Sequence, residues 1–141
     1  MSFEENKTIS RRSYEEPYNK GNLDIADEIT DENVIDHSPM GDIKGREALK
    51  QMDTMLINTF ADLRVKIEDQ IAEGDKVVNR ITFTGIHKGE YMGIAPTGKS
   101  VTITGISIQK IVNGKILEIW GIVDSLSLLQ QIGAVSLPGQ K

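Results

Sequence analysis

Three side chains in this sequence could exchange protons near neutral pH in suitable surroundings: Asp124 and the two histidines, His37 and His87. Asp124 ends a run from Lys115 in which strand alternation places Trp120 and Asp124 on the same face. If that face is concave, the indole partly shields the carboxylate from water and raises its pKa toward the range of a general base. We therefore expect Asp124 to act as a catalytic base in a pocket.

Asp124 and His37 each also have a structural interpretation of equal weight. Asp124 can cap the helix that begins at Ser125 by accepting backbone amide hydrogen bonds. His37 stands where a short extended segment ends before Ser38-Pro39. Its imidazole can donate to a developing enolate oxygen, or it can be tied to Asp36 or to nearby backbone. The sequence predicts a catalytic pair and leaves both alternatives open.

Aromatic and apolar side chains can supply the wall that a flat or apolar ligand needs. Tyr91 and Met92 lie in a glycine-flanked loop that should border the opening, and His87 shares the strand parity of Phe83 and can line the mouth. Most of these residues would serve equally well in the core. The expected ligand-binding residues are Tyr14, Tyr18, Phe60, Phe83, His87, Tyr91, Met92 and Trp120.

Composition argues against several other classes of function. Without cysteine, the chain has no disulfide, no thiolate nucleophile and no thiolate metal site. The histidines and Asp124 come from distant segments without a local ligand pair, so we expect no metal. A formal net charge of −5 disfavours nucleic acid as a partner. No run suits a membrane span or a signal peptide, so we expect no membrane partner and a cytoplasmic protein.

Apolar spacing predicts helices in the first part of the chain and near its end. The clearest stripe is formed by Leu49, Met52 and Leu56, at intervals of three and four residues. Glycines that follow the first and last helices are typical stop signals. The expected helices span residues 3–18, 23–29, 45–60 and 125–132.

From residue 63 onward the apolar pattern changes to alternation, which predicts sheet. Glu73-Gly74-Asp75 and Asn113-Gly114 are tight-turn signals that should join antiparallel hairpins. Arg80 has the opposite parity to Asn79 and is expected at the surface or in a dimer contact. The expected strands span residues 63–71, 76–87, 100–112 and 115–124, with a loop at 88–99. Residues 1–141 are predicted to form one α+β domain, with a core at about 5–135 and a loose tail from 136.

Several stretches resemble one known family over nearly the whole chain, from about Lys7 to Val135. They are Tyr18 to Asn22, Val34 to His37, Phe60 to Leu63, Ile71 to Val77, Gly89 to Lys99 and Asp124 to Gly133. These segments are similar to the SnoaL-like polyketide cyclases, also called ester cyclase-like proteins. The resemblance implies the cone-shaped α+β barrel that this family shares with nuclear transport factor 2, ketosteroid isomerase and scytalone dehydratase, usually as a homodimer and without a cofactor.

The resemblance also implies a reaction. In the polyketide cyclases one acidic residue removes a proton alpha to a carbonyl for an intramolecular aldol closure, and Asp124 is the matching position. The family also places His37 at the pocket, and it commonly has an acidic residue directly after the tryptophan, where this chain has Gly121. The first hypothesis is a cofactor-independent cyclase that acts on an enolisable, polyketide-like carbonyl compound. The second is a binding or stress-associated domain without chemistry. A third, an isomerase or epoxide hydrolase, would need a second carboxylate or a charged relay in the cavity, and the sequence offers no convincing one.

Overall fold

The computed structural model describes residues 2–136 and 138–139, which form four helices and six strands. The helices are α1 (Phe3–Lys20), α2 (Ile25–Ile29), α3 (Arg46–Thr59) and α4 (Ser125–Gln131). The strands are β1 (Thr30–Ser38), β2 (Gly41–Lys44), β3 (Phe60–Glu73), β4 (Lys76–His87), β5 (Ser100–Val112) and β6 (Lys115–Val123). The predicted helices and the four long strands are confirmed to within a few residues. The tail expected from 136 falls partly on residues 137, 140 and 141, which lie outside the described residues.

The hairpin of β1 and β2 corrects the expected order, in which three helices precede the whole sheet. It lies between α2 and α3, and β1 runs parallel to β6 with Asp36 opposite Ile119 and His37 opposite Trp120. Strand β1 contains the polar stretch Asp31 to Asn33, and its partner β6 is distant in the sequence. Local alternation therefore revealed only a short extended segment.

All six strands form one sheet in the order β2-β1-β6-β5-β4-β3. Strands β3 to β6 form an antiparallel meander joined by tight turns. At the turn between β5 and β6, Asn113 and Gly114 have φ values of 50° and 78°, as a type I′ turn requires. Both predicted hairpins are confirmed.

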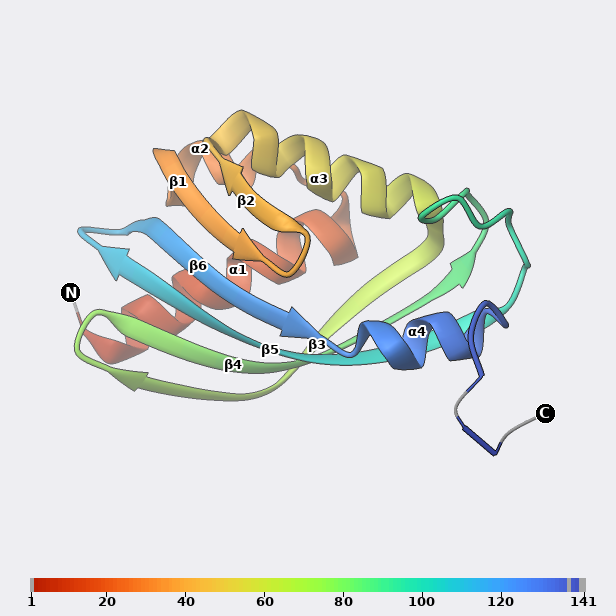
Figure 1. Cartoon of the computed structure of the whole chain (residues 1–141). Helices are drawn as coiled ribbons and strands as arrows, with labels where there is room; N and C mark the ends of the chain where they lie inside the picture. The colour runs from red at the N-terminus through yellow and green to blue at the C-terminus, as the bar shows by residue number, and fades with distance from the viewer. Residues whose placement is uncertain (1, 137, 140–141) are drawn as a thin grey trace.

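The sheet is curved, because α3 contacts both β1, near one edge of the sheet, and β3, at the other edge. Helix α1 lies along the concave side (Figure 1) and bonds through its side chains to β5. We refer to this helix-covered side as the inner face and to the opposite side as the outer face. Along β5 the odd-numbered residues from Val101 to Ile111 are buried on the inner face, and their even-numbered neighbours point outward.

Two apolar clusters fill the space between the helices and the inner face. One includes Tyr18, Phe60 and Ile103, and the other includes Ile29 and Ile116. Buried polar side chains also lie in this space: Ser10 of α1 is bonded to Asn79 and Gln109 of the inner face, where Ser107 is buried too. This polar layer inside the cone is the feature that positions the site described below.

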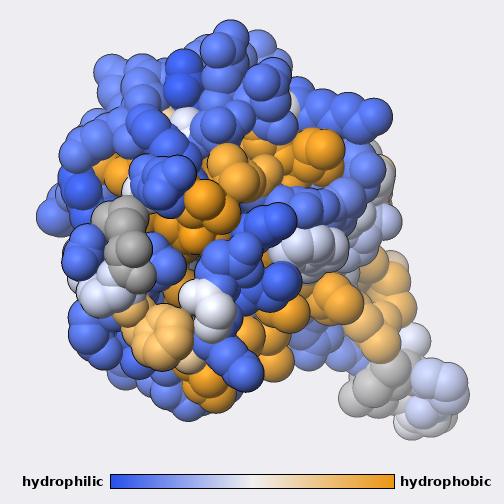
Figure 2. Space-filling view, turned by 90° about the vertical axis from the view of Figure 1, so that its left-hand side faces the viewer, coloured by the Kyte–Doolittle hydropathy of each residue, from blue (hydrophilic) through white to orange (hydrophobic). Residues whose placement is uncertain are grey.

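Apolar side chains also reach the surface. Figure 2 shows them as patches between hydrophilic residues on one side of the molecule. The most exposed large apolar side chains on the sheet are Ile122, Ile71 and Ile106. None of the helices in the part of the chain that the structure describes is long and apolar enough to cross a bilayer.

Candidate functional site

A cavity of about 60 Å³ lies inside the cone, between the inner face and helices α1, α2 and α3. Its wall combines apolar side chains with a few polar groups, the usual composition of a small-molecule site. The apolar part includes Ile25, Ile29, Leu49 and Met52. The polar part consists of Ser13, Tyr14, Tyr18, Thr30, Asp36, Asp53 and Gln109.

Asp53 of α3 and Tyr18 of α1 form a hydrogen-bonded pair at this wall, in which the Tyr18 hydroxyl donates to Asp53 Oδ1. The pKa of the Asp53 carboxyl group is raised to about 7: burial is the main cause, the Tyr18 hydrogen bond opposes it, and the nearby Asp36 carboxylate adds to it. Burial and the charge of Asp53 also hold the pKa of Tyr18 well above its usual range. At neutral pH, Tyr18 therefore remains a donor while Asp53 can take up or release a proton.

The position of Tyr18 is fixed by its neighbour in the helix. The Asn19 side chain donates to the Val65 carbonyl oxygen at 2.9 Å and accepts from the Val65 backbone N–H at 2.8 Å. These two bonds attach the last turn of α1 to β3, and Phe83 contacts the Tyr18 ring edge to face at 5.5 Å. The phenol is thus oriented toward α3 before any ligand binds.

Asp36 of β1 is the second carboxyl group of the cavity. Its parity along β1 matches that of Val34, so it points inward, and only 9% of its surface is exposed. Its pKa is raised to about 6, mainly by burial, with a smaller lowering effect of His37 and a smaller raising effect of Asp42. Within the described ranges, no hydrogen bond to the Asp36 carboxyl group contributes to the shift of its pKa.

The polar layer beside the cavity is a connected hydrogen-bond network between α1 and the sheet. Tyr14 donates to Ser107 Oγ at 2.7 Å, and Asn79 Nδ2 donates to Ser10 Oγ at 2.7 Å. Gln109 accepts from Ser10 and donates to Ser13 Oγ at 3.0 Å. Burial also raises the pKa of the Tyr14 phenol. A satisfied network of this kind holds the polar wall rigid.

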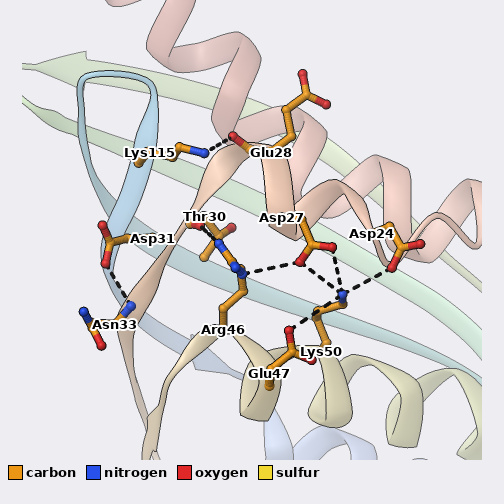
Figure 3. A network of polar contacts seen from close by, with 10 residues as sticks. All are labelled: Asp24, Asp27, Glu28, Thr30, Asp31, Asn33, Arg46, Glu47, Lys50 and Lys115. Carbon is orange, nitrogen blue, oxygen red and sulfur yellow. Dashed lines mark hydrogen bonds and ion pairs between the residues drawn. The ribbon is translucent and has the colours of Figure 1, made fainter.

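The cavity wall carries no positive charge: within residues 2–136 and 138–139, no lysine, arginine or histidine lines it. Two cationic side chains, Arg46 and Lys50, lie at the junction of α2 and α3 (Figure 3), where they are already paired. Lys50 lies 3.2 Å from both Asp24 and Asp27, and Arg46 lies 3.4 Å from Asp27 and donates to the Thr30 carbonyl oxygen. These pairs hold α2 against α3, and within the described ranges neither Asp36 nor Asp53 forms an ion pair.

The structure contradicts the expectation that Asp124 and His37 face the inner cavity. Trp120 and Asp124 share a face of β6 as expected, but the register pairs Trp120 with Ile108 on the outer side of the sheet. Asp124 is exposed, and its carboxylate accepts from the Ser127 backbone N–H at 3.0 Å as the N-cap of α4. The alternative role of Asp124 as a helix cap is therefore confirmed.

His37 also lies on the outer side, because it is adjacent in β1 to the inward-pointing Asp36. Its Nδ1 lies 3.0 Å from Asp42, its Nε2 contacts Glu118, and its ring stacks on Trp120 at 5.5 Å. The hydrogen bonds to Glu118 and Asp42 raise the pKa of His37. His37 and Asp124 border an open depression of the outer face, of about 810 Å³, together with Arg80, whose outward direction confirms its predicted parity.

The expected ligand-binding residues separate into three groups. Tyr14 and Tyr18 line the inner cavity, whereas Phe60 and Phe83 belong to the adjacent apolar cluster. His87 is buried on the inner face, where Nδ1 accepts from the Thr97 backbone N–H at 3.3 Å and Nε2 has no partner in the described part of the chain. Tyr91 packs at the edge of that cluster, whereas Met92 is exposed and Trp120 lies outside.

Sequence reasoning missed Asp36 and Asp53, although both leave a signal. Asp53 directly follows Met52 and lies four residues after Leu49 in the helical stripe, so it interrupts an apolar face. Asp36 alternates with Val34, which is fully buried. A carboxyl group at an apolar position is unusual enough to indicate a site.

Among residues that the structure describes, no three His, Cys, Asp or Glu side chains gather as ligands of a metal ion would. In the described ranges the site is thus a pair of carboxyl groups, two tyrosines and an apolar wall within an α+β cone. Helices packed on a curved sheet around an inner cavity are the architecture of the nuclear transport factor 2-like class of folds.

The sequence profile of the SnoaL-like polyketide cyclases matches residues 8–132. The chain belongs to this family. None of the curated proteins searched matches it significantly.

Solved structures agree with this assignment. TsrD from Streptomyces laurentii is 26% identical, with a TM-score of 0.87 over 96% of this chain and 99% of that one. A candidate polyketide cyclase from Bacillus cereus ATCC 10987 is 30% identical, with a TM-score of 0.78 over 94% of this chain and 83% of that one. A SnoaL-like polyketide cyclase from Agrobacterium tumefaciens C58, at 20% identity and a TM-score of 0.78 over 94% of this chain and 100% of that one, shares the fold.

Proposed function

We propose that this protein is a cofactor-independent cyclase that acts on a small, enolisable, polyketide-like carbonyl compound in the inner cavity, with Asp53 as the general base. The observation that carries the proposal is the hydrogen-bonded pair of Tyr18 and Asp53 at the cavity wall. A base held by a fixed donor, with a pKa of about 7, is suited to proton transfer at neutral pH. Asp53 replaces Asp124 in this role because Asp124 lies on the outer face and caps α4.

The proposed reaction conserves all atoms of the substrate. Asp53 takes a proton from the carbon alpha to one carbonyl, so that a C–H bond breaks and an O–H bond forms. Once protonated, Asp53 no longer requires the hydrogen bond from Tyr18, so the Tyr18 hydroxyl turns and donates to the developing enolate oxygen. The enolate carbon then attacks a second carbonyl carbon of the same molecule, and Asp53 returns its proton to the new alkoxide. The net change is ring closure by C–C bond formation.

Proton–deuterium exchange at the alpha carbon of a β-keto ester tests the first step directly. Asp53→Asn should reduce the exchange rate by about 100-fold, within the usual contribution of a positioned general base. Asp124→Asn is the matched control, since it removes an aspartate charge from the outer face and keeps a residue type that caps helices well. Equal rates in native and Asp53→Asn proteins would remove Asp53 from the mechanism.

A second candidate function is a binding domain without chemistry, and Gly121 is the observation that favours it. Gly121 pairs with Ser107 on the inner face, and a Cβ placed there would meet only the Ser107 Cβ at 3.9 Å. The position at which the family commonly has an acidic residue thus presents no side chain to the cone. Thermal stabilisation by a carbonyl compound that is never turned over would support this alternative.

We also propose that the protein is a homodimer whose contact is the outer face. Ile106 and Ile122 are 54% and 72% exposed there, beside the open depression bordered by Trp120. Apolar surface of this kind is usually covered by a partner, and a two-fold arrangement would place each patch on its own copy.

A further inference from the structure

We infer that the inner cavity selects a ligand that carries a protonated amine, with Asp36 as the group that holds the ammonium. This inference rests on the proposed function, which assigns proton transfer to Asp53 and leaves Asp36 without a role. It adds a substrate class, an amine-bearing carbonyl compound, to the proposed reaction.

The state of Asp36 is the first observation. The residue is 9% exposed, its side chain lines the cavity, and its carboxyl group takes part in no hydrogen bond in the described ranges. A buried carboxylate without a partner is costly, and a charged hydrogen-bond donor from a ligand removes that cost. An ammonium group offers three N–H donors and the opposite charge in one small group.

The charges that surround Asp36 are the second observation. Tyr14 and Tyr18 of α1 and Asp53 of α3 face the same cavity, and none of them is cationic. His37, adjacent in β1, points outward between Asp42 of β2 and Glu118 of β6, so it is already paired.

Arg46 and Lys50 are likewise paired with Asp24 and Asp27 at the outer edge of α2 (Figure 3). The field in the cavity is therefore negative whenever Asp36 or Asp53 is ionised. An anionic ligand is repelled, and a cationic one is attracted.

The size and lining of the cavity agree with such a head group. A volume of about 60 Å³ accommodates an ammonium with a short alkyl stem, while the rest of a larger molecule would extend toward the opening. Tyr14 and Tyr18 place aromatic rings on the same wall, and aromatic faces attract organic cations. The apolar residues Leu49 and Met52 can contact the stem.

The test uses three probes of similar size that differ in charge: n-butylammonium, 1-butanol and butyrate. Each is titrated at pH 7.5 against the ¹⁵N-labelled full chain, and amide chemical shifts are followed. We expect saturable shifts around Asp36 and Asp53 with butylammonium, binding at least tenfold weaker with butanol, and none with butyrate. Equal affinity for the three probes, or butylammonium shifts confined to exposed carboxylates, would overturn the inference.

Two variants locate the interaction. Asp36→Asn should weaken butylammonium binding at least tenfold, whereas Asp69→Asn removes an exposed carboxylate of β3 and should leave it unchanged. If Asp36→Asn fails to fold, the comparison of the three probes on the native chain still decides.

The two proposals can fail separately. If Asp53→Asn loses alpha-proton exchange but the native chain does not bind butylammonium, the amine-binding role of Asp36 is refuted and the cyclase proposal stands. If the native chain binds butylammonium but Asp53→Asn exchanges alpha protons at the native rate, the role of Asp53 as the base is refuted and the amine site stands.

Discussion

The Tyr18 hydroxyl of α1 donates a hydrogen bond to the Asp53 carboxyl group of α3 across the wall of the inner cavity. This bond stabilises the ionised carboxylate and opposes the effect of burial, which favours the protonated form. The two effects leave Asp53 able to titrate near neutral pH. Burial thus sets the direction of the pKa shift of the proposed base, and the Tyr18 hydrogen bond limits its size.

Replacing Tyr18 with phenylalanine should raise the pKa of Asp53 above its native value of about 7, because the bond that stabilises the carboxylate is lost. The carboxyl ¹³C shift of Asp53 in a pH titration measures this change. Tyr14→Phe is the control, since the Tyr14 hydroxyl donates to Ser107 and not to a carboxylate. A pKa that stays constant or falls in Tyr18→Phe would contradict the proposed relationship.

The raised pKa of Asp53 predicts that stability declines as the pH rises. The folded protein holds this proton up to about pH 7, whereas the unfolded chain releases it near the ordinary value of 3.8. Between these values the folded state binds more protons, so the free energy of unfolding falls with pH and levels off above pH 7. The total loss is on the order of 4 kcal/mol at about 1.4 kcal/mol per pH unit. Urea unfolding from pH 4 to pH 8 measures it.

Asp53→Asn removes the titrating group and replaces it with a side chain of nearly the same shape. The free energy of unfolding of this variant should therefore depend less on pH than that of the native protein. Part of the slope should remain, because Asp36 has a pKa of about 6 and contributes in the same direction at lower pH. A native protein whose stability rises from pH 5 to pH 7 would contradict both assignments.

The sequence predicted the elements well because their signals are local. The stripe through Leu49, Met52 and Leu56 specifies α3, and Asn113-Gly114 specifies the turn between β5 and β6. The site depends on which face of each strand is covered, and that is not local. Trp120 and Asp124 were correctly placed on one face of β6, but the parallel pairing with β1 and the position of α1 make that face the outer one.

Parity errors of this kind exchange every residue of a strand between the two faces. On β6 the inner face is occupied by Ile119, whose side chain points inward, and by Gly121, which shares its parity and has no side chain. The sequence indicates Asp36 only as an alternative partner of His37. Because β1 contains several polar residues, its pattern does not show which face of the strand is buried. The fold could be predicted from local patterns and family resemblance, whereas the site required the pairing of distant strands.

Gly105 and Gly121 occupy inner-face positions of neighbouring strands and should respond differently to alanine. A Cβ at Gly105 would lie 2.8 Å from Val123 Cγ1 and 2.9 Å from the Ile122 carbonyl oxygen, whereas the position of Gly121 is open. Gly105→Ala should destabilise the protein by about 1–3 kcal/mol through overpacking. Gly121→Ala should change stability by less than about 1 kcal/mol. Equal unfolding midpoints for the two variants would contradict the packing described here.

The ion pairs of Lys50 are predicted to hold α2 in place over the cavity. This side chain is 17% exposed and reaches Asp24 and Asp27, while α2 itself has only five residues and no side-chain cap. A helix this short depends on tertiary contacts. Lys50→Met should speed hydrogen exchange of the α2 amides several-fold, and Lys66→Met, which removes a more exposed lysine on β3, should not. Unchanged hydrogen exchange of the α2 amides in Lys50→Met would show that the Lys50 ion pairs do not hold α2 in place.

The exposed isoleucines of the outer face provide a test of the proposed homodimer. If two copies meet there, Ile122→Glu should abolish association, because it places a charge without a partner in a contact between apolar side chains. Light scattering at micromolar concentration should show a native dimer and a monomeric variant with unchanged circular dichroism. Met92→Glu is the control, since Met92 is also exposed but lies in the loop between β4 and β5. A monomeric native protein would refute the homodimer. Dimers of both variants would mean that the contact between the two copies does not include Ile122.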